Sequence, residues 1–200
     1  MLKFHRWTHK NDKPYRLSQE LLTNNSAVKH KMATNINEGR ATSLEPNEEE
    51  DAIIVEVTEH IRKRYFKHKP VTFEVFEPLT PEWKNEFKYP AGGYAWGDNW
   101  SNQVIHLTRC HDKKAFYELV FHEVYRLNTP EGHETIFPKE RRYIEEKFGV
   151  KLDKWLPLQD EIIRTLYCVD KKMLEDSLKN CGEQSRTMQE IEQRAKELGL

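Results

Sequence analysis

Cysteine is scarce in this chain, and long apolar stretches are missing. Three cysteines, Cys110, Cys168 and Cys181, occur in 200 residues. Their odd number and the lack of CxxC spacing argue against a disulfide framework and against a cysteine-based zinc site. No apolar run approaches the ~20 residues that a transmembrane helix needs. We therefore expect a soluble protein without a membrane span, in a reducing intracellular compartment.

An excess of charge of either sign is also missing. The 32 basic and 33 acidic side chains give a formal net charge of -1, which provides no broad electrostatic footprint for nucleic acid. The sequence contains neither a Gly-rich phosphate-binding loop nor a GxSxG nucleophile elbow. One local basic patch, Arg62, Lys63 and Arg64, lies in "IRKRYFKHKP". Such a patch is most often a solvated helix end, although it could contact phosphate or an acidic partner.

Residues 1–46 lack a sustained hydrophobic period and include an Asn-, Ser- and Thr-rich stretch, so we interpret them as a polar and basic N-terminal arm or linker. The opening segment has no apolar core of a secretory signal. It is either an arm that docks on a partner or stays mobile, or a targeting segment. The protein is accordingly expected in the cytoplasm, with an organelle such as the mitochondrion as the alternative.

Hydrophobic periodicity then predicts an α+β domain over residues 47–150. A helix begins after Asn47, a short strand covers 71–75, and a second strand ends in "VIHLT", with a glycine-rich aromatic turn region between the strands. A long helix follows Asp112, which is suited to cap it. A shorter helix is expected from Pro138 to Gly149.

Residues 151–200 predict a C-terminal helical extension. Its expected helices cover 158–168, 171–179 and 186–200, and the last carries a narrow apolar stripe. Such a stripe normally packs on its own domain, while binding of a partner is the less common role.

The helix after Asp112 is apolar on most sides. Its polar strip consists of Glu118, His122, Arg126 and Thr129, which recur at helical spacing. Because a helix of this kind is buried in its domain, the strip must line a cleft or belong to a satisfied internal network.

The same helix contains "HEVYR", an HExxH zinc motif with one replaced position. In HExxH, two histidines one turn apart bind one zinc ion, and the glutamate activates the bound water. His122 and Glu123 match the first ligand and the base, whereas Arg126 replaces the second ligand. A guanidinium has no available lone pair and stays protonated, so it cannot bind zinc.

The order of elements around this motif resembles the small zincin-type metallopeptidases of the SprT-like and WLM groups. The resemblance covers about residues 48–150 and includes "AGGYAWG", "NQVIHLT", the motif helix and "GHETIF". It implies a small zincin-like domain with a short mixed sheet. It also implies that His122 and His133 are zinc ligands and that Glu123 is the catalytic base.

Three interpretations follow from Arg126. In the first, the domain has lost its metal, and Arg126 pairs with Glu123 or Glu134. Alternatively, zinc is still held by His122 and His133 with a substitute ligand, His106, His111 or Glu134. In the third interpretation the match is accidental, and His122 is a core histidine bonded to a carbonyl.

We favour the first interpretation. It predicts an inactive metallopeptidase homologue, without a cofactor, that serves as a binding or structural component of a protein assembly. The alternatives are an active zinc metallopeptidase with unusual coordination and a nucleic-acid-associated protein that uses Arg62, Lys63 and Arg64.

Overall fold

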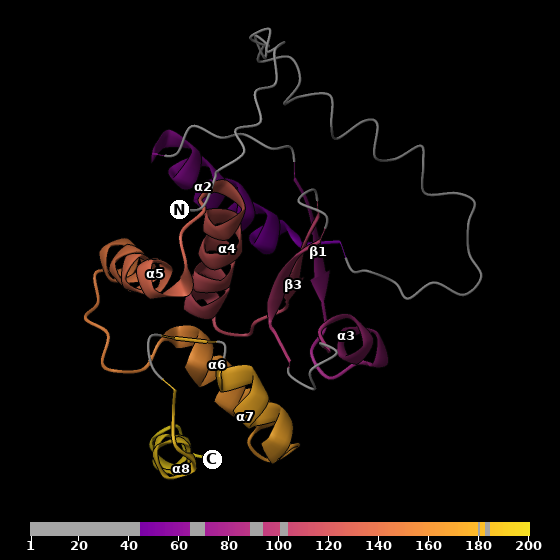
Figure 1. Cartoon of the computed structure of the whole chain (residues 1–200), viewed down its shortest axis with the longest axis vertical. Helices are drawn as coiled ribbons and strands as arrows, with labels where there is room; N and C mark the ends of the chain where they lie inside the picture. Colours follow the sequence, from indigo (N-terminus) through magenta and orange to yellow (C-terminus); the bar gives the residue numbers. More distant parts are fainter. Residues whose placement is uncertain (1–44, 65–70, 89–93, 101–103, 180, 183–184) are drawn as a thin grey trace, which may run out of the picture. The chain divides into compact units, whose positions relative to one another are not determined.

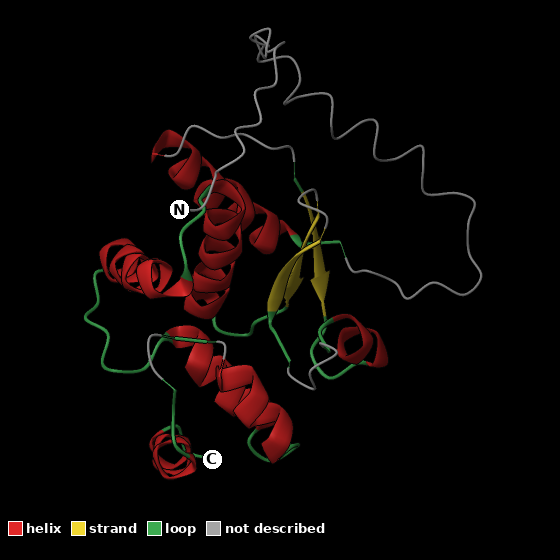
Figure 2. Ribbon diagram, in the orientation of Figure 1, coloured by secondary structure: helices red, strands yellow, loops and turns green. Residues whose placement is uncertain are grey.

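Seven helices and three short strands make up the described part of the chain (Figures 1 and 2). The structure is a computed structural model, and it describes residues 45–64, 71–88, 94–100, 104–179, 181–182 and 185–200. The predicted α+β class is confirmed. The predicted arm, residues 1–46, lies outside the described residues except for Glu45 and Pro46.

Helix α2 (Glu48–Arg64) begins where the sequence predicts. The Asn47 side chain accepts a hydrogen bond from the Glu50 amide at 2.9 Å, and the Glu50 carboxylate accepts one from the Asn47 amide at 2.8 Å. These reciprocal bonds satisfy backbone donors that the first turn of a helix leaves free. The apolar face of α2 is buried through Ile54, Val57 and Ile61.

A three-stranded mixed sheet lies beside the motif helix, where the resemblance implied a short mixed sheet and the sequence pattern predicted two strands. Strand β3 (Val104–Thr108) is central, with β1 (Thr72–Phe76) parallel on one side and β2 (Gly97–Trp100) antiparallel on the other. Strand β2 was not predicted, because residues 97–100 were assigned to the glycine-rich turn region. Its pairing with β3 places Gly97 opposite Leu107.

The two faces of β3 pack against different helices. On one face, Thr108 accepts a hydrogen bond at 2.6 Å from the indole of Trp83 in α3 (Pro81–Glu86). The residues of the other face, Ile105 and Leu107, are fully buried and alternate with His106 and Thr108 along the strand. In Figure 1, α3 and α4 lie on opposite sides of the sheet.

The motif helix α4 (Lys113–Asn128) is buried from Ala115 to Tyr125, as its apolar sequence predicts. The Asp112 side chain accepts a hydrogen bond from the Lys114 amide at 2.7 Å, which confirms the predicted N-cap. Because every side of this helix is covered by protein, its polar side chains must find partners inside the domain.

Helix α5 (His133–Phe148) begins five residues before the predicted start at Pro138. The first turn forms on Gly132, whose carbonyl accepts hydrogen bonds from the amides of Thr135 at 3.0 Å and Ile136 at 3.2 Å. Pro138 therefore lies inside the helix rather than in its first turn. The predicted end is confirmed, since Gly149 adopts a left-handed conformation with φ of 62°.

Three more helices complete the described chain: α6 (Pro157–Leu166), α7 (Lys171–Lys179) and α8 (Met188–Glu197). Helix α6 ends two residues before the predicted Cys168. Ile162, Leu174 and Ile191, one from each helix, belong to the same hydrophobic core as α2 and α4. Residues 151–200, predicted as an extension, thus share the core of the domain. None of the described helices combines the length and the apolarity needed to cross a membrane.

Candidate functional site

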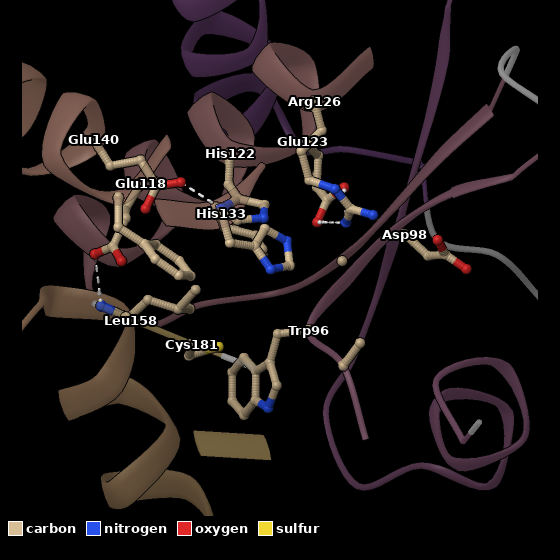
Figure 3. Close-up of a pocket in the computed structure, with 15 residues that line it drawn as sticks. Trp96, Asp98, Glu118, His122, Glu123, Arg126, His133, Glu140, Leu158 and Cys181 are labelled. Atoms are coloured by element: carbon tan, nitrogen blue, oxygen red, sulfur yellow. Dashed lines mark hydrogen bonds and ion pairs between the residues drawn. The ribbon is translucent and has the colours of Figure 1, made fainter. Parts of the chain in front are cut away.

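A cavity of about 350 Å³ opens at the polar strip of α4 (Figure 3). Glu118, His122 and Arg126 line it, so these three residues of the predicted strip face a cleft, whereas Thr129 is not among the lining residues. The other walls of the cavity come from segments that are distant in the sequence: β2, α5 and the C-terminal segment. The further lining residues are Ala95, Trp96, Gly97, Asp98, Leu119, Glu123, His133, Phe137, Glu140, Leu158, Cys181 and Gly182.

His122 is held in place by Glu140 of α5. The Nδ1 atom of His122 lies in a short hydrogen bond with Oε1 of Glu140, and both side chains are buried. A carboxylate accepts here, so Nδ1 carries the proton and Nε2 keeps the lone pair. Burial lowers the pKa of His122, which keeps the ring neutral. This arrangement is typical of a histidine that is oriented either for a metal or as a base.

His133 lies next to His122, as the resemblance implies. The two ring centroids are 5.0 Å apart, and Phe137 packs against both rings. Burial, together with the neighbouring His122 and Arg126, lowers the pKa of His133. The cavity therefore contains two neutral imidazoles side by side.

Glu123 is paired with Arg126. Its Oε2 lies 3.3 Å from Nη1 of Arg126 and accepts a second hydrogen bond from the Asn99 side chain at 3.0 Å. Burial raises the pKa of Glu123, while His122 and Arg126 act in the opposite direction. The carboxyl group expected to activate water is thus engaged by protein donors.

Gly97 of β2 allows this placement of Glu123. A Cβ atom at position 97 would lie 2.7 Å from Cγ of Glu123, closer than real carbon contacts. Strand β2, which the sequence did not predict, therefore shapes the site, because the lack of a side chain at Gly97 leaves room for Glu123.

Glu118 lies deeper in the cavity wall. Its carboxyl group accepts a hydrogen bond at 2.9 Å from the amide of Leu158, in the first turn of α6. Burial raises the pKa of Glu118 well above its ordinary value, and the nearby Glu140 adds to this effect. A neutral carboxylic acid is consequently favoured at this position.

The three predicted substitute ligands lie elsewhere in the described structure. His106 was one possible substitute ligand, but its ring lies between Glu86, at 2.6 Å from Nδ1, and Glu74, at 3.2 Å from Nε2. These contacts belong to the sheet face that carries α3. His111 is exposed and contacts Glu161 at 3.1 Å. Glu134 is exposed at the start of α5 and is not among the cavity residues.

The donors around the cavity do not fit a zinc site. Among the residues that the structure describes, no three His, Cys, Asp or Glu side chains form a group that could hold a metal ion. Arg126 also adds a positive charge that opposes a dication. The third interpretation, an accidental match, expected His122 to bond a carbonyl. Instead, His122 bonds the carboxylate of Glu140.

Arg62, Lys63 and Arg64 occupy the last turn of α2 and are exposed. Cations are favoured at this end of a helix dipole, so their position has a structural reason. They do not line the cavity of the motif helix.

The sequence did not single out three residues of this site, Glu140, Asp98 and Cys181. For Glu140 a signal was present, because it continues the buried face of Ile136 and Phe137 on α5. An acid on an apolar helix face indicates a buried partner. Because the predicted helix began at Pro138, Ile136 and Phe137 were not assigned to the same helix as Glu140.

Comparisons with known proteins provide no assignment. No family model, no curated protein and no solved structure matches the chain.

Proposed function

We propose that this protein is a zincin-like domain that does not hydrolyse peptides and instead binds a protein partner as a component of a larger assembly. The observation that carries the proposal is the ion pair between Arg126 and Glu123 in the cavity. Arg126 binds the expected base, Glu123, and itself stands at the position of the second histidine ligand of the motif.

The chemistry of the motif explains why one arginine matters. In a zincin-type site the glutamate must accept a proton from a metal-bound water. Here Glu123 accepts from Arg126 and Asn99, and the metal would lose its second histidine. The cation of Arg126 compensates the buried carboxylate without any metal.

Further observations around this pair support the proposal. His122 and His133 are adjacent, with ring centroids 5.0 Å apart, and Glu140 orients His122. A cavity of about 350 Å³ lies within the range of ~300–1,000 Å³ that is usual for ligand sites. A site of this size, with acids and imidazoles, suits recognition of a polar peptide segment. Because all three cysteines are free, a reducing intracellular setting also remains part of the proposal.

Restoring the motif tests the proposal. We expect the Arg126→His variant to gain about one zinc ion per chain, because histidines four residues apart on a helix share one face. Purified wild-type protein should retain no stoichiometric zinc after dialysis. Metal analysis and calorimetric zinc titration measure both quantities.

Matched variants separate ligation from the loss of charge. Arg126→Gln removes the same cation without supplying a ligand and should stay metal-free. Adding His133→Ala to Arg126→His should abolish the gained zinc. Stoichiometric zinc in the wild type that disappears in His122→Ala would overturn the proposal.

A second candidate is supported by the orientation of His122. Its protonated Nδ1 faces Glu140, which leaves Nε2 as the atom able to bind a metal. An active zinc peptidase with unusual coordination would show proteolysis that chelators inhibit and that Glu123→Gln abolishes. Activity that survives Glu123→Gln would exclude this candidate.

A further inference from the structure

A second, smaller hollow of about 130 Å³ lies between α2, α4 and α5, away from the cavity of the motif helix. These three helices lie side by side in Figure 1. Arg64 of α2 meets Lys139 and Arg142 of α5 at this hollow. Arg64 therefore meets, at one point of the fold, two cations that lie 75 and 78 residues further along the chain.

Two of these cations form no ion pair within the part of the chain that the structure describes. Lys139 pairs with Glu131 and Tyr125. For Arg64 and Arg142, in contrast, no side-chain hydrogen bond or ion pair is formed with any residue that the structure describes. Two guanidinium groups at one hollow repel each other, and an anion between them removes that repulsion. The carboxylate of Glu146, also at the hollow, offsets only part of the positive charge.

The floor of the hollow is aromatic. Tyr143 stacks on Phe121 with ring centroids 4.8 Å apart, and the ring of His60 lies 4.7 Å from Tyr143. An apolar wall on one side strengthens the field of nearby charges, because solvent screens them less there. Burial is the main cause that lowers the pKa of His60, and the charge of Arg64 lowers it further, whereas Glu146 and Glu56 act in the opposite direction.

We propose that this hollow binds the phosphoryl group of a phosphomonoester, held between Arg64 and Arg142. A phosphomonoester carries a charge of about -1.5 to -2 at neutral pH and offers three acceptor oxygens, which match the fork of donors on each guanidinium. A volume of about 130 Å³ is below the ~300 Å³ of sites that enclose whole ligands, so it suits one group at the end of a ligand.

A nucleic-acid backbone matches these observations less well. Polyanions are bound by extended basic stripes on chains of high positive charge. This chain has a net charge of -1, and its cations converge on a single hollow. The site therefore favours one terminal phosphate over a row of phosphodiesters.

The experiment uses the full chain and two probes, phenyl phosphate and inorganic phosphate, titrated by calorimetry at constant ionic strength. We expect both to bind, and each of Arg64→Gln and Arg142→Gln to weaken binding by about tenfold or more, the usual effect of losing a charge-assisted hydrogen bond. The matched control is Arg62→Gln, which changes an exposed arginine of the same helix turn that does not line the hollow. It should bind as the wild type does.

An NMR readout locates the site independently of affinity. Phosphate should shift the ring resonances of His60, and this shift should disappear in Arg142→Gln. Three results would overturn the proposal: no binding of either probe at millimolar concentration, equal weakening in Arg62→Gln, or an oligonucleotide that binds more tightly than both probes. Because Arg64 and Arg142 are exposed, the thermal midpoint should be unchanged in all three variants.

Discussion

Three carboxyl groups, those of Glu118, Glu123 and Glu140, lie in the interior around the main cavity, and each is at most 2% exposed. Each accepts a hydrogen bond from the protein, which offsets part of the cost of leaving water. Burial nevertheless raises the pKa of Glu118 and of Glu123. Burial therefore opposes the ionisation of Glu118 and Glu123 in the folded state, although His122 and Arg126 favour the charged form of Glu123.

We expect Glu118→Gln to make stability less dependent on pH. The folded-state pKa of Glu118 lies well above its ordinary 4.5, so the native state binds this proton more tightly than the unfolded chain does. Its contribution to the free energy of unfolding is thus present below about pH 4.5 and is lost as pH rises towards the folded pKa. Relative to the variant, the wild type should lose ~1 kcal/mol or more between pH 5 and pH 8. Urea denaturation at both pH values measures the difference.

Glutamine keeps an acceptor oxygen for the Leu158 amide, so the change removes mainly the titration. Glu192→Gln is the matched control, because Glu192 is exposed on α8. Identical pH profiles for Glu118→Gln and the wild type would contradict the assignment.

At the residue scale, sequence reasoning identified the groups on one helix and, through the resemblance, His133 on α5, but it missed Glu140, which also meets them from α5. Glu118, His122 and Arg126 share a face by helical spacing alone. Glu140 reaches His122 only because α4 and α5 pack together. His106 was a possible substitute ligand at the cavity, yet the pairing of β3 with its neighbours turns it towards Glu74 and Glu86.

Among the elements, β2 and the start of α5 were the hardest to predict. The β2 sequence "GDNW" contains Gly, Asp and Asn, which are depleted in strands, and its antiparallel pairing with β3 compensates for that. Pro138 normally marks a first turn. Here it stands in the second turn of α5, where it leaves the Glu134 carbonyl without its helical donor.

The end of α5 supports a quantitative prediction. Gly149 has φ of 62°, and a Cβ atom there would meet no atom within 4 Å. The cost of Gly149→Ala is thus conformational only, and we expect a loss of ~1 kcal/mol in the free energy of unfolding. Gly149→Asn should cost clearly less, because asparagine tolerates the left-handed region. Chemical denaturation of both variants measures the difference. Equal losses would show that packing rather than backbone conformation determines the effect.

On the scale of the whole molecule, the C-terminal helices complete the domain. Leu158 and Cys181 line the main cavity, and Ile162, Leu174 and Ile191 lie in the common core. We expect a chain that ends at residue 150 to lose cooperative thermal unfolding, because α4 would expose apolar side chains along one face. Circular dichroism and calorimetry of this shortened chain test the prediction.

A sharp thermal transition of residues 1–150 would contradict it and would mean that residues 151–200 are a separable extension. The control is a chain shortened only before α8, at residue 186, which removes less of the core. It should unfold cooperatively at a lower midpoint than the full chain.

The contact between His122 and Glu140 provides a fingerprint that does not depend on position 126. The two residues are 18 positions apart, and the spacing is set by the geometry of two packed helices rather than by metal chemistry. A pattern that requires His-Glu followed by this distant glutamate would group chains by their scaffold, whether position 126 holds histidine or arginine.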